Sequence, residues 1–167
     1  MQKFPEINNK ELSTKAFTHR SYINEAKKPM ESNERLEFLG DSILSFIISE
    51  HLFNTYPAFN EGILTNLRSL VVNTKSLAKE AHVLDFGQYL LLSKGEEESK
   101  GRKNDSILAN TFEAFIGSLY MDQGITAVKK FLEDTLIPHI QEYVEKKVFK
   151  DPKSLLQEYV QAKGMPA

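Results

Sequence analysis

The stretch from Asn33 to Ser42 constrains the fold of this chain more than any other, because its apolar and acidic residues both recur at helical spacing. Apolar side chains follow at intervals of three and four, which places them on one face of an α-helix: Leu36, Leu39, Ile43 and Ile47. Three carboxylates have the same spacing, and at about 100° per residue they fall within roughly 60° of one another: Glu34, Glu37 and Asp41. The stretch therefore predicts a helix with a core face and an acidic face.

The acidic stripe has two interpretations. On the same side of the helix, Asp41 is followed by the apolar residues Leu44 and Ile48. We therefore expect the second half of the helix to be apolar nearly all round and to run through the middle of the domain. Neighbouring like charges destabilise a helix, and a divalent cation would offset their repulsion. The helix dipole alone would favour Glu34 and Glu37 near the N-terminus, but not Asp41 two turns further in. At this point both a metal site and a solvated acidic face stay open.

The composition is that of one ordinary globular domain and excludes several other classes. The chain has 167 residues, of which 41% are hydrophobic and 26% charged, a balance that disordered proteins lack. No apolar run approaches the roughly 18 residues of a membrane span, and the N-terminus lacks a secretory pattern. Because there is no cysteine, a metal would have to bind through oxygen or histidine nitrogen. We therefore expect a cytoplasmic protein with no membrane partner.

The formal net charge of −2 means that nucleic-acid binding would depend on local basic patches. The first patch consists of Lys100, Arg102 and Lys103. The second is a spread of lysines near the C-terminal end: Lys146, Lys147, Lys150 and Lys153. Each patch has a plain alternative, a solvated loop for the first and cations near a helix C-terminus for the second.

Helical spacing recurs along the chain and strict apolar–polar alternation is hard to find, so we predict an all-α fold. The helix of the first stretch should end before Pro57. The expected N-caps or first residues of three helices are Ser32 or Asn33, Asn60, and Asn73 or Thr74. From Ser93 to Asp105 the sequence is charged and contains glycine but no apolar face, which predicts an exposed loop.

A later helix, with Ser106 near its cap, supplies further oxygen donors. Its core stripe is formed by Leu108, Phe112, Phe115 and Leu119. Asn110 and Glu113 lie on the other side together with Ala114 and Gly117, whose small side chains would let another helix approach closely. We predict two helices with opposed polar faces and four oxygen donors between them: Glu37, Asp41, Asn110 and Glu113.

Two segments resemble a known family. The nine residues Glu34–Ser42 (ERLEFLGDS) resemble, without a gap, the signature of the ribonuclease III family of double-stranded-RNA endonucleases. Ile107–Ala114 (ILANTFEA) resembles the family's second catalytic motif, with Asn110 in place of the usual aspartate. The resemblance extends from about Lys15 to Gly124. It includes a local motif at Thr18–Ser21, where we interpret His19 and Arg20 as scaffold.

The resemblance implies a dimeric helical bundle around a central buried signature helix, and a magnesium-dependent cleavage of double-stranded RNA in which Mn²⁺ can substitute. It implies that Asp41 and Glu113 are catalytic and that the metal ligands are Glu37, Asp41, Asn110 and Glu113. Glu34 and Glu61 become accessory acids, although the helix dipole alone would explain Glu61. Lys100, Arg102 and Lys103 become candidates for RNA binding. The implied products carry 5′-phosphate and 3′-hydroxyl ends with two-nucleotide 3′ overhangs.

Two further expectations concern assembly and domains. Phe38 lies some 100° or more from the core stripe, where an exposed phenylalanine is costly, so we expect a partner subunit to cover it. Residues 1–149 are expected to form the endonuclease domain. Residues 150–167 are expected to hold a linker and the start of a truncated double-stranded-RNA-binding domain. The segment Ser154–Lys163 resembles the first helix of such a domain.

Asn110 keeps the function open, because an amide oxygen is a weaker magnesium ligand than a carboxylate and accepts no proton. The chain could be an active ribonuclease with reduced metal affinity. It could instead be a catalytically impaired dimer that binds double-stranded RNA, or a purely structural all-α dimerisation module that binds no magnesium.

Overall fold

The computed structural model describes residues 4–148, and within this range the chain is all-α, as predicted. The helices are α1 (Lys10–Ala16), η1 (Arg20–Glu25), α2 (Glu34–Thr55), α3 (Glu61–Val72), α4 (Thr74–Val83), η2 (Phe86–Gln88), α5 (Lys94–Glu98), η3 (Gly101–Lys103), α6 (Asp105–Asp134) and α7 (Ile137–Glu145), where η denotes a 3₁₀-helix. The predicted linker and second-domain segment, 150–167, lies outside the described residues. No helix of the described part is long and apolar enough to cross a membrane.

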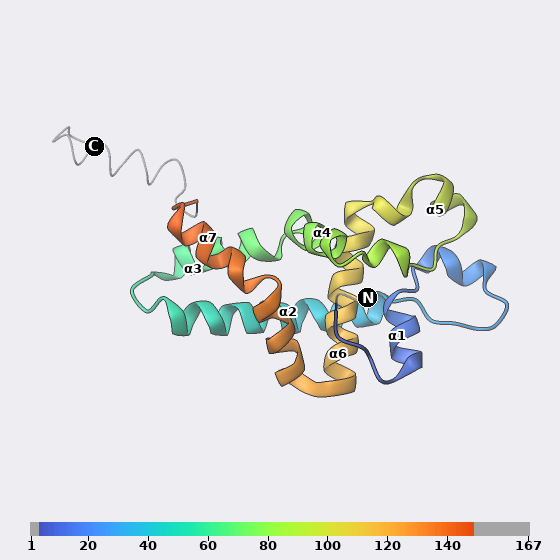
Figure 1. Ribbon diagram of the computed structural model, residues 1–167, viewed down its shortest axis with the longest axis horizontal. Coiled ribbons are helices and arrows are strands. Elements are labelled where there is room, and N and C mark those ends of the chain that lie inside the picture. Colours follow the sequence, from blue (N-terminus) through green and yellow to red (C-terminus); the bar gives the residue numbers. More distant parts are fainter. Residues whose placement is uncertain (1–3, 149–167) are drawn as a thin grey trace.

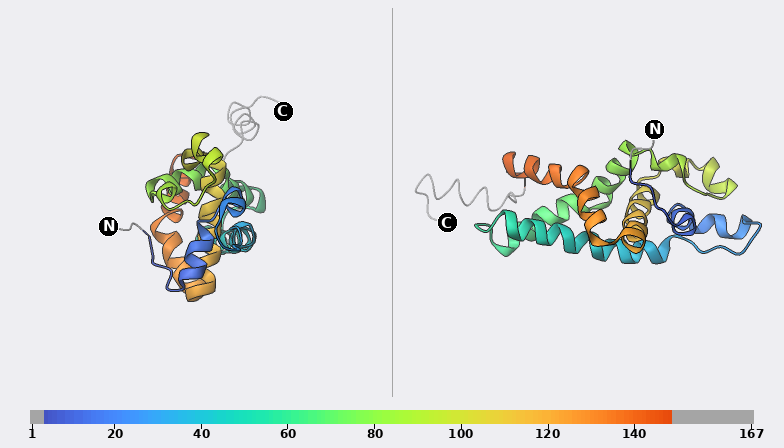
Figure 2. Two further views of the ribbon diagram at one scale, coloured as in Figure 1. Left: turned by 90° about the vertical axis from the view of Figure 1, so that its right-hand side faces the viewer. Right: turned by 60° about the horizontal axis from the view of Figure 1, so that its bottom comes forward.

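The molecule is elongated along α2, and α6 crosses this helix steeply (Figure 1). The chain segments at one end of α2 are α3 and α7, while α1 lies near the other end (Figures 1 and 2). α2 and α6 form the most extensive contact between any two helices of the described part. The position of their crossing therefore determines where the polar residues of the two helices meet.

The backbones of α2 and α6 touch at two glycines. A Cβ atom placed on Gly40 would lie 1.8 Å from the carbonyl oxygen of Glu113, and one placed on Gly117 would lie 2.3 Å from the carbonyl oxygen of Leu36. Neither position has room for a side chain, since real Cβ atoms do not approach backbone oxygen so closely. The close approach predicted from the small residues of α6 is confirmed, and it presses the backbone of Glu113 against the helix that carries Glu37 and Asp41.

The predicted core stripes are buried, apart from one residue of α2. All four stripe residues of α6 are inaccessible to solvent, and on α2 Leu36, Ile43 and Ile47 are buried while Leu39 is half-buried. Leu44 and Ile48 in the second half of α2 are also buried. This half is nevertheless not buried all round, because Phe46 and Phe53 are 57% and 71% exposed. The expectation was wrong on this point, since α3 and α6 cover α2 on one side and leave the phenylalanine side open within one chain.

Asparagines begin four of the helices as N-caps. Their side-chain oxygens accept hydrogen bonds from backbone N–H groups of the first turns of α1, α3, α4 and α6: Asn9, Asn60, Asn73 and Asn104. Asn33 occupies the N-cap position of α2, but its buried amide instead donates to the carbonyl of Ala16 at 3.2 Å. This bond fixes the start of α2 to the end of α1.

The segment from Ser93 to Asp105 is mostly exposed, as predicted, but it is not a loop, because it forms α5 and η3. Ser93 caps α5 by accepting a hydrogen bond from the Glu96 N–H at 3.2 Å. Arg102 holds η3 in place, because its guanidinium donates to the carbonyl oxygens of Gly87 and Leu90 at 2.8 Å each. These contacts join residues that are distant in sequence, so an apolar stripe was not needed to order the segment.

The glycine contact predicts a selective loss of stability. Gly117→Ala should lower the free energy of unfolding by about 1–3 kcal/mol, because the new methyl group overlaps a backbone oxygen that cannot rotate away. Gly95→Ala is the matched control, since Gly95 lies in α5 with no atom within 4 Å of its would-be Cβ. That variant should be neutral or more stable by up to about 1 kcal/mol. Urea unfolding measures both, and equal effects would contradict the packing described.

Candidate functional site

The predicted oxygen donors come from two places, the first turns of α2 and the first turns of α6. Glu37 and Asp41 lie on α2, and Asn110 and Glu113 lie on α6. Glu113 is partly buried, and burial followed by the negative charges of Asp41 and Glu37 raises its pKa to about 7. Because this repulsion requires proximity, the three carboxylates converge on one region.

Glu37 is close to further charged residues, as the causes of its raised pKa show. Burial, then the charges of Glu34 and Asp41, raise the pKa of Glu37, while the positive charge of Arg20 opposes this rise. Glu34 is exposed on the first turn of α2, so it lies at the solvent side of the group. We call Glu34, Glu37, Asp41 and Glu113 the acidic cluster. Its residues carry four like charges when ionised, which a bound cation would reduce.

The donor chemistry of the acidic cluster fits a hard cation. Within residues 4–148, no three His, Cys, Asp or Glu side chains lie so that they already form a metal-binding group. Magnesium needs no such cage, because proteins usually bind it through one or two carboxylates while it keeps several waters. The amide oxygen of Asn110 adds a neutral donor. The residues therefore fit magnesium in kind, with water completing the coordination.

A polar cavity lies beside the acidic cluster, at the meeting point of η1, α2 and α6. Its volume is about 340 Å³, and it is lined by His19, Arg20, Asn33, Glu34, Glu37, Ser106, Ile107 and Asn110. Glu37 and Asn110, two of the predicted ligands, thus share this cavity across the two helices. The cavity gives the cluster a neighbouring space that a substrate group could enter.

His19 and Arg20, which we interpreted together as scaffold, differ. His19 caps η1, since its Nδ1 accepts a hydrogen bond from the Ser21 N–H at 3.3 Å. Arg20 has a side chain that is 73% exposed, and it pairs with the Glu34 carboxylate at 3.5 Å. The scaffold interpretation is therefore wrong for the Arg20 side chain. No local pattern could have revealed this pair, because it depends on how the start of α2 packs against the end of α1.

Glu61 lies apart from the acidic cluster within this chain. It is in the first turn of α3, where its Oε1 accepts a hydrogen bond from the Thr65 hydroxyl at 2.9 Å. It lines a mainly apolar cavity together with Phe46 and Phe53 from the second half of α2. The accessory role of Glu61 stays a prediction, and the structure does not bring Glu61 to the other acids of the same chain.

The basic residues of the first patch also separate into two groups. Lys100 and Lys103 are exposed around η3. Arg102 is engaged within the protein, because its guanidinium also binds the Glu97 carboxylate in addition to the two carbonyl oxygens. Lys146 and Lys147 are exposed after α7, whereas Lys150 and Lys153 lie outside the described residues. Lys100 and Lys103 are thus the residues of the first patch whose charges are open to a partner.

Comparison with known proteins places the chain among ribonucleases. A protein-family model described as Ribonuclease-III-like matches residues 9–140. Proteins named Ribonuclease 3 from Bacillus licheniformis and Bacillus velezensis are 51% and 52% identical to the chain over 160 and 157 residues, or 95% and 93% of its length. The chain spans 64% and 63% of the lengths of these relatives.

Solved structures agree with this placement. The nuclease domain of ribonuclease III from Campylobacter jejuni, described with a flexible region involved in dimer formation, superposes with a TM-score of 0.72 at 38% identity, covering 77% of this chain and 87% of that one. Dicer from Pichia stipitis superposes with a TM-score of 0.65 at 26% identity, covering 89% of this chain and 63% of that one. The predicted fold class, an all-α nuclease domain of this kind, is confirmed.

The raised pKa of Glu113 predicts that metal-free protein loses stability as the pH rises. Between the ordinary value of 4.5 and about 7, the folded state binds more protons than the unfolded state, so the free energy of unfolding falls across this window. Glu113→Gln should make that fall shallower, leaving the part due to Glu37, and stabilise the protein at pH 8 by on the order of 1–2 kcal/mol, a value discounted for solvent screening. Urea unfolding with a chelator present measures the effect.

Glu98→Gln is the control, since Glu98 is an exposed acid on α5. It should leave the pH profile of the wild type unchanged. A Glu113→Gln profile that falls as steeply between pH 4.5 and 7 as the wild-type profile would show that burial and the neighbouring acids do not raise the pKa of Glu113.

Proposed function

Because this chain belongs to the ribonuclease III family, we propose that it is a magnesium-dependent endoribonuclease that cleaves double-stranded RNA. The observation that supports this most directly is the convergence of Asp41 and Glu37 from α2 on Glu113 from α6. Carboxylates from two helices at one place are the donors that phosphodiester hydrolysis with divalent cations requires. The proposed products have 5′-phosphate and 3′-hydroxyl ends and two-nucleotide 3′ overhangs.

Four residues would hold the metal, with Asp41 and Glu113 as the principal, catalytic ligands and Glu37 and Asn110 as the others. When bound, Mg²⁺ (or Mn²⁺ in its place) would activate the attacking water and neutralise charge on the phosphate and the leaving oxygen, through two ions in the mechanism we favour. The burial of Glu113 limits access of bulk water to its carboxylate. The contact at Gly40 and Gly117 sets the separation of the two ligand pairs.

Other residues would hold the RNA. Glu34, at the edge of the polar cavity, and Glu61 would assist through waters or direct RNA contacts. Lys100 and Lys103 would bind phosphates, and Arg102 would support them by holding η3. Duplex RNA is recognised mainly by its shape, phosphates and 2′-hydroxyls, so we expect little sequence preference.

We further propose that the protein acts as a cytoplasmic homodimer, in which residues 1–149 form the endonuclease domain and residues 150–167 form a linker and the start of a truncated double-stranded-RNA-binding domain. Phe38, Phe46 and Phe53 are 78%, 57% and 71% exposed and recur along α2. A stripe of three exposed phenylalanines is costly in water, and a second copy would cover it. In the dimer, the two nuclease domains would form a valley across the RNA with one catalytic centre at each end.

One observation favours a second function, a dimer that binds double-stranded RNA but cleaves it poorly. Asn110 stands where the family's motif has an aspartate, so the donor set has one carboxylate fewer. A neutral amide binds magnesium more weakly and cannot accept a proton. Binding of the duplex would be preserved, since Asn110 contributes no positive charge to it.

Comparison of the chain with its Asn110→Asp variant tests these two functions. Asn110→Asp should lower the magnesium concentration for half-maximal cleavage of long duplex RNA by about tenfold, because one charged ligand replaces a neutral one. Cleavage is followed by gel electrophoresis across a magnesium titration. Glu113→Gln is the inactive control, which should abolish cleavage while the protein stays folded.

The outcomes separate the alternatives. Cleavage only by Asn110→Asp would establish the impaired RNA-binding dimer, and equal cleavage by both chains would mean that the amide suffices. Unchanged turnover of Glu113→Gln would remove Glu113 from the mechanism. Magnesium titration by calorimetry addresses the third possibility, since a purely structural module would give no binding heat.

The exposed phenylalanine stripe predicts that Phe38→Ser weakens dimerisation without unfolding the monomer. The dimer dissociation constant should rise at least about 30-fold, as expected for an aromatic residue near the centre of an interface. Sedimentation equilibrium measures this constant. Val83→Ser is the control, because Val83 is 54% exposed at the end of α4 and away from the stripe. An unchanged constant for Phe38→Ser would place the interface elsewhere.

A further inference from the structure

The polar cavity beside the acidic cluster contains one permanently positive side chain, that of Arg20. Of the residues that line this cavity, Glu34 and Glu37 are acidic, and Arg20 is the arginine that faces them. Arginine keeps its charge at any physiological pH and presents a planar fork of donors that matches phosphate oxygens. The cavity thus combines proposed metal ligands with a group suited to an anion.

The backbone around Arg20 is held on three sides. The His19 N–H donates to the Leu91 carbonyl at 3.1 Å, and the Asn33 N–H donates to the Thr18 carbonyl at 2.9 Å. The Ser93 N–H donates to the Ser21 hydroxyl at 3.0 Å. These bonds fix η1 against the starts of α2 and α5. The backbone of Arg20 therefore has a fixed position relative to Glu37. Binding of a ligand by the Arg20 side chain would then require no further ordering of this backbone, which lowers the entropic cost of binding.

The head of Arg20, by contrast, is available. Its side chain is 73% exposed, and its ion pair with Glu34, whose side chain is 54% exposed, has an N–O distance of 3.5 Å. Exposed pairs of this kind contribute little to stability. A phosphate entering the cavity could therefore take the place of Glu34 on the guanidinium at little cost to the fold.

RNA needs such a cation at this position. The acidic cluster repels a polyanion, and metal ions bound by its carboxylates would neutralise only the phosphate under attack. A neighbouring phosphate that entered the polar cavity would still face Glu34 and Glu37, which line it. Arg20 is the charged group on this wall that can attract it.

We propose that Arg20 binds a backbone phosphate of the RNA strand adjacent to the phosphate under hydrolysis, with the polar cavity as the subsite. This inference rests on the proposed function. It assigns to Arg20 a direct contact with the substrate in place of the scaffold role suggested by the sequence. The contact holds the strand in register with the acidic cluster without using a metal ligand.

A rival role would be indirect, in which Arg20 only neutralises Glu34 and Glu37. The two roles differ in two measurable quantities. A phosphate contact contributes about 1 to the slope of log binding constant against log salt concentration, for each protomer. A residue that acts only on the acids leaves this slope unchanged, and its removal would instead tighten magnesium binding by unmasking their charge.

The experiment measures binding of a defined blunt duplex RNA at several salt concentrations, with Glu113→Gln as the background so that no cleavage occurs. Adding Arg20→Gln should weaken binding about tenfold and reduce the salt slope by about 1 per protomer. Arg20→Lys should restore most of the slope, because the charge is kept. Circular dichroism and sedimentation verify that each variant is folded and in the same oligomeric state.

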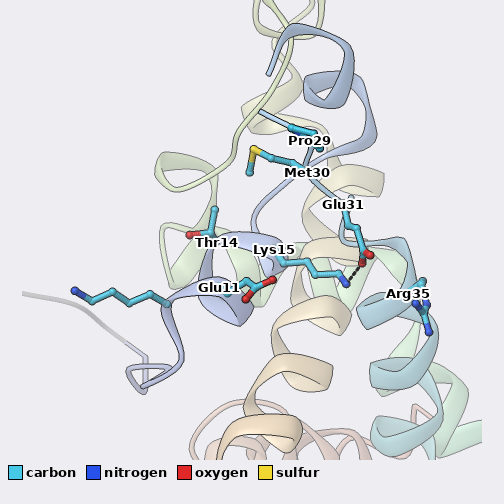
Figure 3. A pocket seen from close by; sticks show the side chains of 8 residues that line it. Glu11, Thr14, Lys15, Pro29, Met30, Glu31 and Arg35 are labelled. Atoms are coloured by element: carbon cyan, nitrogen blue, oxygen red, sulfur yellow. Dashed lines mark hydrogen bonds and ion pairs between the residues drawn. The ribbon is translucent and has the colours of Figure 1, made fainter. Parts of the chain in front are cut away.

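Arg35→Gln is the matched control. Arg35 is the residue after Glu34 on α2, but it lines a different pocket, near the Lys15–Glu31 ion pair (Figure 3). The control removes the same charge from a nearby residue, on the first turn of α2, that does not line the polar cavity, so it should leave the salt slope unchanged. Equal loss of slope in Arg20→Gln and Arg35→Gln would mean that only net charge matters, and this would overturn the inference.

The remaining outcomes distinguish failure of the phosphate contact from failure of the proposed function. An unchanged slope in Arg20→Gln, with a lower magnesium requirement for cleavage in the otherwise wild-type chain, would overturn the phosphate contact and leave the proposed function intact. A wild-type chain that neither binds nor cleaves duplex RNA would overturn the proposed function, and the subsite with it. A reduced slope for Arg20→Gln alone would support the subsite even if Asn110 has made cleavage weak.

Discussion

The contact between the backbones of α2 and α6 is the constraint on which the rest of the structure depends. Gly40 and Gly117 allow each helix to touch a carbonyl group of the other, so the distance between the helices is set by main-chain atoms. One of these carbonyls belongs to Glu113 itself. The acidic cluster therefore does not rely on long side chains to bridge a gap, and the packing imposes both the burial and the repulsion that raise the pKa of Glu113.

Much of this arrangement was predictable from the sequence because it depends on the spacing of apolar, polar and small residues along each helix. Intervals of three and four gave the core faces of α2 and α6, and asparagines at helix starts gave the caps of α3 and α4. The same spacing, read for polar residues, placed Asn110 and Glu113 opposite the core stripe. Small residues on that side indicated the close crossing. Each of these features depends on residues within about one or two turns of a helix.

The features that were missed depend on contacts between segments far apart in the chain. Arg102 orders a segment without an apolar stripe by binding the carbonyls of Gly87 and Leu90. Arg20 reaches Glu34 only because Asn33 ties the start of α2 to the end of α1. The open side of α2 was also missed, because periodicity identifies apolar faces but does not tell which neighbour covers them.

The position of Phe38 next to Glu37 on α2 has a consequence for how the protein behaves in solution. Phe38 is 78% exposed, and Glu37 belongs to the acidic cluster, so a surface that covers the phenylalanine must lie against the carboxylates. The cleavage activity would then depend on the fraction of the protein that is dimeric. In the proposed dimeric nuclease, the turnover per molecule would decline on dilution instead of staying constant, and the concentration of the protein would limit its own activity.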